Sequence, residues 1–171
     1  MRCPTLTFVA GPNGAGKTTL TSGNLTVFSN LPLLDPDALA NTIHPDTTIH
    51  PDTRSKHPLA AGREVLKRIQ ENLRERRSFA VETTLSGKIY LQVMLEARRI
   101  GFGIGLIYIA TSDVNIHIAR VARRIELNGH PVPEEDIRRR YFRSLDHLLI
   151  AVPRTDLTVL FDNSEDVLAS Q

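Results

Sequence analysis

The 171-residue chain has very little cysteine, and this scarcity excludes two kinds of protein. Its one cysteine, Cys3, has no partner for a disulfide within the chain, and no cysteine cluster is present to bind structural zinc. No apolar run approaches the roughly 20 residues that a membrane-spanning helix needs. The apolar N-terminal stretch is short and leads into a glycine-rich loop, so we interpret it as a strand and expect a cytoplasmic protein without a membrane partner.

The chain also lacks a strong excess of either charge. Lysine and arginine total 21, aspartate and glutamate total 19, and the formal net charge is +2. So small an excess is weak evidence for nucleic acid, which is therefore a disfavoured partner. Hydrophobic residues make up 41% of the sequence, which is typical of a globular protein, and the length suits one domain over residues 1–171.

Short apolar segments alternate with amphipathic segments along the chain. This order predicts a three-layer α/β fold, in which a mostly parallel five-stranded sheet has helices on both faces. A helix is expected to begin within the sequence GKTTL and to end near Gly23, and the strand containing Pro32 is expected at a sheet edge. The expected strands are 5–10, 31–34, 78–83, 105–110 and 157–161, and the later helices are 59–77, 89–99, 114–127 and 133–150.

Residues 42–53 consist of the hexad TIHPDT repeated twice. Proline at every sixth position excludes a continuous helix or a central strand, and two copies are too few for a solenoid. We interpret residues 42–57 as an inserted surface loop, because loops tolerate insertions. The functional alternative is a lid or a partner-binding loop.

A phosphate-binding loop is the strongest motif in the sequence. GPNGAGKT, at residues 11–18, matches the pattern GxxxxGK[ST] and lies between a predicted strand and a predicted helix. Backbone N–H groups of such a loop close around phosphate oxygens, and the helix N-terminus adds partial positive charge. Lys17 is expected to bind the β- and γ-phosphates of ATP, and the Thr18 hydroxyl to bind Mg²⁺. The expected nucleotide-binding residues are Gly11, Pro12, Asn13, Gly14, Ala15, Gly16, Lys17, Thr18 and Thr19.

Two motifs of other phosphate-binding-loop proteins are missing. The guanine-reading pattern NKxD does not occur, and no apolar run gives a clear Walker B strand 40–60 residues further on. The chain's small size then favours a small-molecule kinase over a GTPase or an ATPase core.

Acidic residues follow two of the predicted strands, at the sheet edge where open α/β folds bind ligands. Asp37 is a candidate general base for an acceptor hydroxyl, but it is equally placed to cap the next helix, and Asp35 is a rival two residues away. Glu82 is a candidate to hold substrate hydroxyls or a magnesium-bound water. The alternative is that its surroundings only introduce a helix capped by Thr84 or Ser86.

Arginines gather in the helix predicted over residues 114–127. A helical wheel places His117, Arg120 and Arg124 on one flank and Arg123 on the other. Arg120 and Arg124 repel each other unless an anion lies between them, and a triphosphate is such an anion; a solvated face is the alternative. The wheel does not choose among the arginines of residues 138–143. The expected apolar stripe of this helix is Val114, Ile118, Val121 and Ile125.

Six segments along the chain form a recognisable series. They are GPNGAGKTT (11–19), DPD (35–37), AGREVL (61–66), ETTLSG (82–87), ARVARRIELNGHPVPEEDIRRRY (119–141) and DNS (162–164). Taken together, these segments resemble the small zeta-toxin-like P-loop kinases, and the combination of ETTLSG with the stretch containing GHPVPE is the specific part of the likeness. The resemblance implies an adenylate-kinase-like fold and phosphorylation of a hydroxyl on a UDP-N-acetyl sugar.

The resemblance also implies roles for individual residues. It favours Asp37 as the catalytic base, and it implies ATP, Mg²⁺, a small-molecule hydroxyl acceptor and an antitoxin partner, with residues 114–150 as a lid-like helical pair. The alternatives are an ATP-binding switch or toxin–antitoxin component without turnover, and a polynucleotide 5'-hydroxyl kinase. The implied catalytic residues are Asp37, Lys17, Arg120 and Arg124, and the implied substrate contacts are Asp37, Glu82, Thr83 and Arg140.

Overall fold

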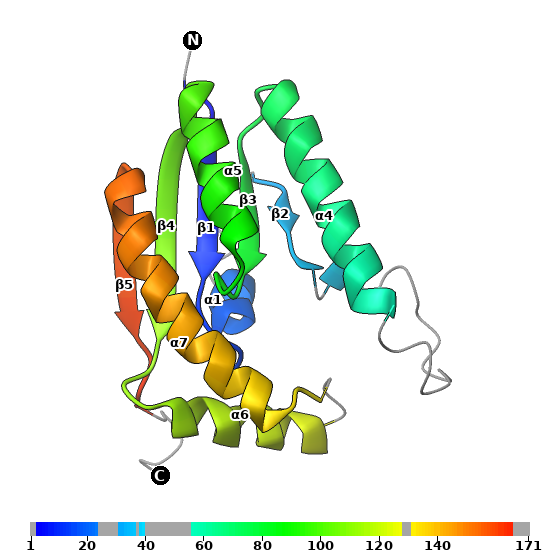
Figure 1. Cartoon of the computed structure of the whole chain (residues 1–171), viewed down its shortest axis with the longest axis vertical. Helices are drawn as coiled ribbons and strands as arrows, with labels where there is room; N and C mark the ends of the chain where they lie inside the picture. The colour runs from blue at the N-terminus through cyan, green and yellow to red at the C-terminus, as the bar shows by residue number, and fades with distance from the viewer. Residues whose placement is uncertain (1–2, 24–30, 37, 40–55, 128–130, 166–171) are drawn as a thin grey trace.

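The structure is a computed structural model that describes residues 3–23, 31–36, 38–39, 56–127 and 131–165 (Figure 1). Two sequence predictions fall outside this part of the chain, namely the role of Asp37 and the TIHPDT repeat. The strands are β1 (Thr5–Ala10), β2 (Leu33–Leu34), β3 (Phe79–Thr83), β4 (Gly103–Ala110) and β5 (Leu157–Asp162). The helices are α1 (Lys17–Gly23), α4 (Lys56–Arg74), α5 (Lys88–Arg99), α6 (Val114–Glu126), α7 (Glu134–Ala151) and the 3₁₀ helix η2 (Val152–Arg154).

The described strands form one sheet in the order β2-β3-β1-β4-β5, and every pairing is parallel. This confirms the predicted five-stranded α/β fold, with β2 at an edge as expected. β1 lies at the centre, where it pairs with β3 on one side and with β4 on the other. The loop that leaves β1 therefore has the carboxyl ends of two strands beside it.

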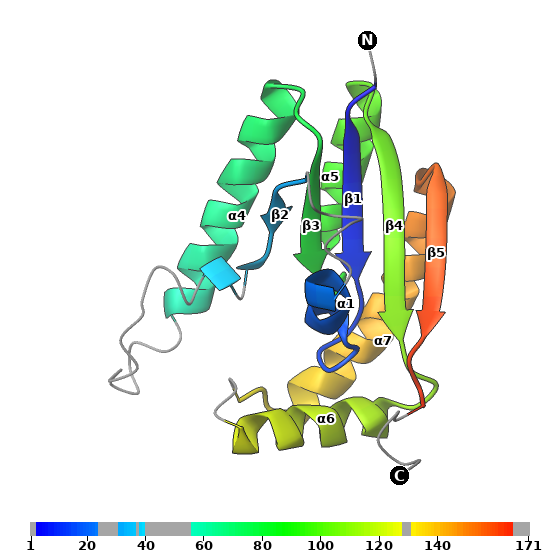
Figure 2. The ribbon, with the colours of Figure 1, turned by 180° about the vertical axis from the view of Figure 1, so that it is seen from behind.

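Helices lie on both faces of the sheet. α4, α5 and α7 lie on one face, and α1 lies on the other, as the two opposite views show (Figures 1 and 2). Because side chains alternate along a strand, Phe8 faces the larger core, with Ile69 and Met94, whereas Val9 faces a smaller cluster that includes Ala15. β3 is buried at all five positions, as a strand covered on both faces should be.

The first long helix is displaced from its predicted position. α4 begins at Lys56 and ends at Arg74, whereas the apolar periodicity predicted residues 59–77. A proline within the first turn of a helix costs nothing, because its missing N–H would have no intrahelical partner there. At the other end Arg76 adopts a positive φ of 55°, which an α-helix cannot continue through.

Candidate active site

The phosphate-binding loop connects the central strand β1 to α1 at the carboxyl edge of the sheet. Its turn is closed by the Ala15 N–H, which donates to the Pro12 carbonyl over 3.2 Å. The Lys17 Nζ donates to the same carbonyl over 3.1 Å, so the ammonium lies folded over the loop that it is expected to serve. Thr19 is exposed on the first turn of α1. The residues predicted to bind nucleotide thus form one continuous loop and helix N-terminus.

A buried carboxylate lies directly beside this loop. Glu82, near the end of β3, is 6% exposed, and its Oε1 accepts a hydrogen bond of 3.1 Å from the Thr18 Oγ1. The Gly11 N–H also donates to the Thr83 carbonyl over 3.2 Å, which ties the loop to the same strand. A threonine hydroxyl and a carboxylate are the hard oxygen ligands that Mg²⁺ prefers, so the donors fit this ion. The described residues contain no group of three or more His, Cys, Asp or Glu side chains able to hold a metal.

The segment after β3 forms a tight turn and does not cap the next helix. The Thr83 hydroxyl accepts the Leu85 N–H over 3.0 Å, and Leu85 adopts a positive φ of 55°. Thr84 and Ser86 bond to each other through their hydroxyls at 2.8 Å. The N-cap of α5 is Gly87, which makes no side-chain capping bond. The alternative interpretation, with Thr84 or Ser86 as the cap, is therefore wrong.

α7 brings one of its arginines to the phosphate-binding loop. The Arg140 Nη1 donates to the Asn13 Oδ1 over 3.1 Å. Arg138 and Arg139 instead pair with acidic side chains of the first turn of their own helix. Of these three neighbours, which the wheel could not separate, the structure brings Arg140 to the predicted nucleotide site.

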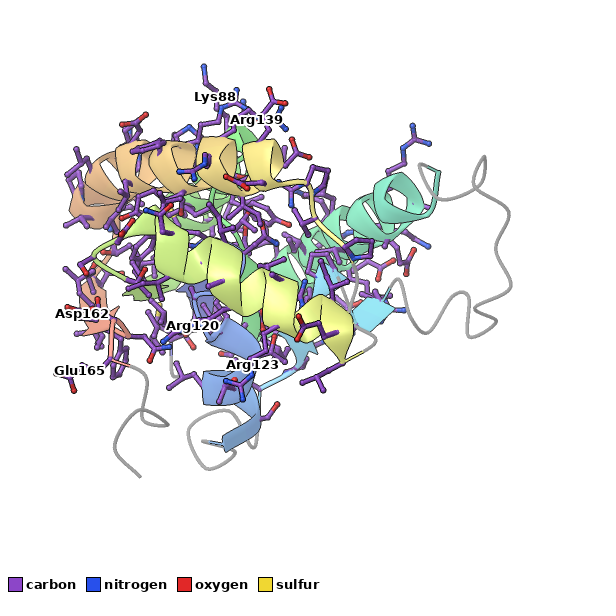
Figure 3. The ribbon with its side chains drawn as sticks, turned by 90° about the horizontal axis from the view of Figure 1, so that it is seen from below. Lys88, Arg120, Arg123, Arg139, Asp162 and Glu165 are labelled. Carbon is purple, nitrogen blue, oxygen red and sulfur yellow. The ribbon has the colours of Figure 1, made fainter. Side chains whose placement is uncertain are left out.

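The arginines of α6 are distributed differently from the wheel's prediction. Arg120 and Arg123 line one cavity of about 330 Å³, and both project from the α1 side of the helix (Figure 3). Arg124 lies exposed on the last turn. The wheel grouped Arg120 with Arg124 and placed Arg123 on the other flank. In the structure Arg120 instead lines the same cavity as Arg123. The remaining residues that line the cavity are Asn115, Ile116 and Ala119.

His117 is the most deeply buried polar residue of α6, although the wheel placed it on a polar flank. It is 0% exposed, and its Nδ1 lies 2.9 Å from the Asn13 carbonyl. Burial lowers the pKa of His117 below the usual 6.5; the hydrogen bond to Asn13 opposes this shift, and the charges of Arg120 and Lys17 add to it. His117 is therefore neutral near pH 7. The buried residues of this helix are His117 and Val121, whereas Ile125 of the predicted apolar stripe is 39% exposed.

Asn163, just after β5, is a second residue whose role the sequence did not indicate. Its Nδ2 donates to the Ala15 carbonyl over 2.9 Å, and its N–H donates to the Ala110 carbonyl over 2.8 Å. A Cβ at Gly16, where φ is +98°, would lie 2.7 Å from this Nδ2. The end of β5 therefore closes against the phosphate-binding loop. The sequence signals were the position of DNS directly after a predicted strand and its place among the segments of the family resemblance.

A chain of buried hydroxyls connects β4 and α7 to the turn after β3. The Ser144 Oγ donates to the Thr84 carbonyl over 2.7 Å and lies 2.8 Å from the Tyr108 hydroxyl. His147 lies one turn further along α7, and its Nδ1 is 2.8 Å from the Leu85 carbonyl. Burial raises the pKa of Tyr108 to about 12, so its hydroxyl stays protonated. α7 thus holds the turn that follows Glu82.

Asp35 lies where the carboxyl edge of the sheet continues past β2. Its carbonyl accepts the Leu39 N–H over 3.0 Å, so a helical turn follows the strand. Asp37 lies outside the described residues, and both its predicted role as a base and its alternative role as a cap stay predictions.

The fold and the loop together define a P-loop kinase-like protein. The model of the Zeta toxin family matches residues 2–166, and the chain belongs to this family. An uncharacterized protein of Haemophilus influenzae is 32% identical over 134 residues, which cover 78% of this chain and 90% of that protein. None of the described helices is both long and apolar enough to cross a membrane.

Two solved structures share the fold at low sequence identity. One comes from the PezAT chromosomal toxin–antitoxin system of Streptococcus pneumoniae, with a TM-score of 0.72, 18% identity, and coverage of 95% of this chain and 69% of that one. The other is the AvrRxo1-ORF1:-ORF2 complex with ATP, with a TM-score of 0.63, 16% identity, and coverage of 89% and 50%. These likenesses show that the chain shares its fold with both structures.

Proposed function

We propose that this protein is an ATP- and Mg²⁺-dependent kinase that phosphorylates a hydroxyl of a small metabolite. The observation that carries the proposal is the pairing of Thr18 with the buried carboxylate of Glu82, beside a complete phosphate-binding loop. Membership of the Zeta toxin family supports a UDP-N-acetyl sugar as the first acceptor to test. The similarity to the PezAT structure supports an antitoxin protein as a partner.

In the proposed reaction the acceptor oxygen attacks the γ-phosphorus of ATP. The new O–P bond forms as the bond from the γ-phosphorus to the β,γ-bridging oxygen breaks, ADP leaves, and Asp37 accepts the acceptor's proton. Lys17, Arg120 and Arg124 stabilise negative charge on the phosphoryl group being transferred. Mg²⁺, when bound by Thr18, neutralises charge on the β- and γ-phosphates.

The remaining predicted residues have supporting roles in this proposal. Arg140 and Asn13 hold the loop in place, Thr83 contacts the acceptor, and Glu82 contacts the acceptor beside the ion position that it shares with Thr18. The whole chain acts as a single kinase domain, and the helical pair over residues 114–150 covers the nucleotide.

An untargeted assay tests the proposal directly. The protein is incubated with Mg²⁺-ATP and a bacterial metabolite extract that contains UDP-N-acetylglucosamine, and mass spectrometry follows any species that gains a phosphate. Lys17→Ala is the control variant. Phosphorylation of the nucleotide sugar by the wild type alone supports the full proposal. Phosphorylation of a different metabolite keeps the kinase assignment and identifies that metabolite as the acceptor. Measured ATP binding with no phosphorylated product would contradict the kinase assignment and favour an ATP-binding switch.

A further inference from the structure

α6 reaches the phosphate-binding loop through one buried imidazole. The His117 Nδ1 lies 2.9 Å from the Asn13 carbonyl oxygen. A carbonyl oxygen only accepts hydrogen bonds, so Nδ1 carries the proton of the neutral ring and donates it. Within the described residues the other ring nitrogen, Nε2, has no hydrogen-bond partner. The polar interaction of this ring is therefore directed at the loop.

The helix backbone also lies directly against the loop. A Cβ at Gly14, where φ is +80°, would lie 2.8 Å from the His117 carbonyl oxygen and 3.3 Å from the Val121 Cγ2. No side chain larger than hydrogen fits at this position, so the loop and α6 are in backbone contact. A change in the position of His117 is thus transmitted to the loop without a deformable layer between them.

The geometry of the peptide bond gives this contact a consequence for anion binding. In a trans peptide the carbonyl of Asn13 and the N–H of Gly14 point in opposite directions within one plane. A hydrogen bond that holds the carbonyl toward α6 therefore aims the Gly14 N–H away from α6. Such loops bind phosphate through N–H groups aimed at a common point.

We propose that His117 is a positioning residue for nucleotide binding, which holds the Asn13–Gly14 peptide in its phosphate-binding orientation. The identity of the ligand rests on the proposed function. The orientation of the peptide depends only on the contact between α6 and the loop. The two can therefore be tested separately.

α7 supplies a matched control. His147 is also buried, at 8% exposure, and its Nδ1 donates to a carbonyl over 2.8 Å. That carbonyl belongs to Leu85, in the turn after β3. Replacing His147 removes the same kind of hydrogen bond from the protein core but leaves the Asn13–Gly14 peptide held.

The test compares His117→Leu, His117→Asn and His147→Leu by calorimetric titration with Mg²⁺-ATP. Leucine keeps most of the ring's volume but has no donor, whereas asparagine is smaller but places an N–H donor close to the position of Nδ1. We expect His117→Leu to weaken ATP binding roughly 5- to 10-fold, and His117→Asn and His147→Leu to stay within about threefold of the wild type. Equal losses in His117→Leu and His147→Leu, or no advantage of asparagine over leucine, would overturn the inference.

Hydrogen exchange gives a readout that does not require a nucleotide. His117→Leu should accelerate amide exchange in residues 11–18, and His147→Leu should accelerate it in residues 84–87 instead. If the wild type binds no ATP, the proposed function fails, and this exchange pattern alone decides the role of His117. Acceleration confined to residues 11–18 in His117→Leu supports the role, and an unchanged or uniform pattern rejects it.

Discussion

The Thr18 hydroxyl donates to the Glu82 carboxylate over 3.1 Å, although 64 positions separate the two residues in the sequence. The contact joins the start of α1, which follows β1, to the end of the neighbouring strand β3. Thr18 belongs to the nucleotide loop and Glu82 begins the ETTLSG segment. The hydrogen bond therefore connects the two functional segments directly. Four predictions test this arrangement and its surroundings.

Glu82→Gln should separate the charge of this side chain from its shape. Glutamine still accepts a hydrogen bond from Thr18 but contributes no negative charge toward a cation. We expect the rate of phosphoryl transfer to fall roughly 10- to 100-fold and the required magnesium concentration to rise. Initial rates over a magnesium titration measure both effects, with the exposed Glu135→Gln as control. An unchanged magnesium dependence would count against a role of Glu82 near the ion.

Asp37→Asn should abolish phosphoryl transfer and preserve ATP binding. Asparagine cannot accept the acceptor's proton, so we expect a rate loss of roughly 100-fold or more. Asp35→Asn, two residues away, is the matched control and should retain activity. Product formation measured beside ATP titration distinguishes the cases, and a parallel loss of ATP binding in Asp37→Asn would argue against the role as a base.

Two glycine substitutions should change stability in opposite directions. At Gly16 φ is +98°, and a Cβ would lie 2.7 Å from the Asn163 Nδ2, so Gly16→Ala should cost about 1–3 kcal/mol of unfolding free energy. Gly62 lies within α4, and a Cβ added there would meet no atom of the described residues within 4 Å beyond its chain neighbours and its own helix backbone, so Gly62→Ala should gain about 0.5–1 kcal/mol. Urea unfolding measures both changes. A Gly16→Ala protein as stable as the wild type would show that neither the positive φ nor the contact with Asn163 makes glycine necessary at this position.

The free energy of unfolding should fall as pH drops below the usual histidine pKa of 6.5. His117 has a lowered pKa in the folded protein, so the unfolded chain binds a proton there while the folded chain does not. The contribution of His117 to the free energy of unfolding is therefore fully present above pH 6.5. It is lost as the pH falls from 6.5 toward the lowered pKa of the folded protein. Urea unfolding from about pH 5 to about pH 8 should show a shallower slope for His117→Asn than for the wild type. Identical slopes for the two proteins would show that a group other than His117 takes up the proton on unfolding.

The sequence was sufficient for the parts of the site that consist of consecutive residues. The phosphate-binding loop was recognisable because its function needs a fixed local spacing of glycines and a lysine. The parallel sheet followed from the alternation of segments, and α7 begins at Glu134, within one residue of the predicted start at 133.

The sequence was insufficient where a side chain's environment comes from a distant segment. A wheel counts His117 as polar, but its hydrogen-bond partner lies 104 positions earlier, so local periodicity could not predict its burial. The choice of Arg140 over its neighbours likewise depends on Asn13, 127 positions away. The sequence predicted that this helix extends to residue 77, whereas α4 ends at Arg74. The spacing of apolar residues gives no sign of the positive φ that Arg76 adopts.

The hydrogen bond from Asn163 to the Ala15 carbonyl spans 148 positions of the chain. During synthesis the phosphate-binding sequence emerges 148 positions before the side chain that closes it. The loop's final geometry therefore depends on β5 joining the sheet, and closing so long a stretch of chain carries a high entropic cost. A nascent chain lacking β5 would carry the complete nucleotide motif without the support that shapes it.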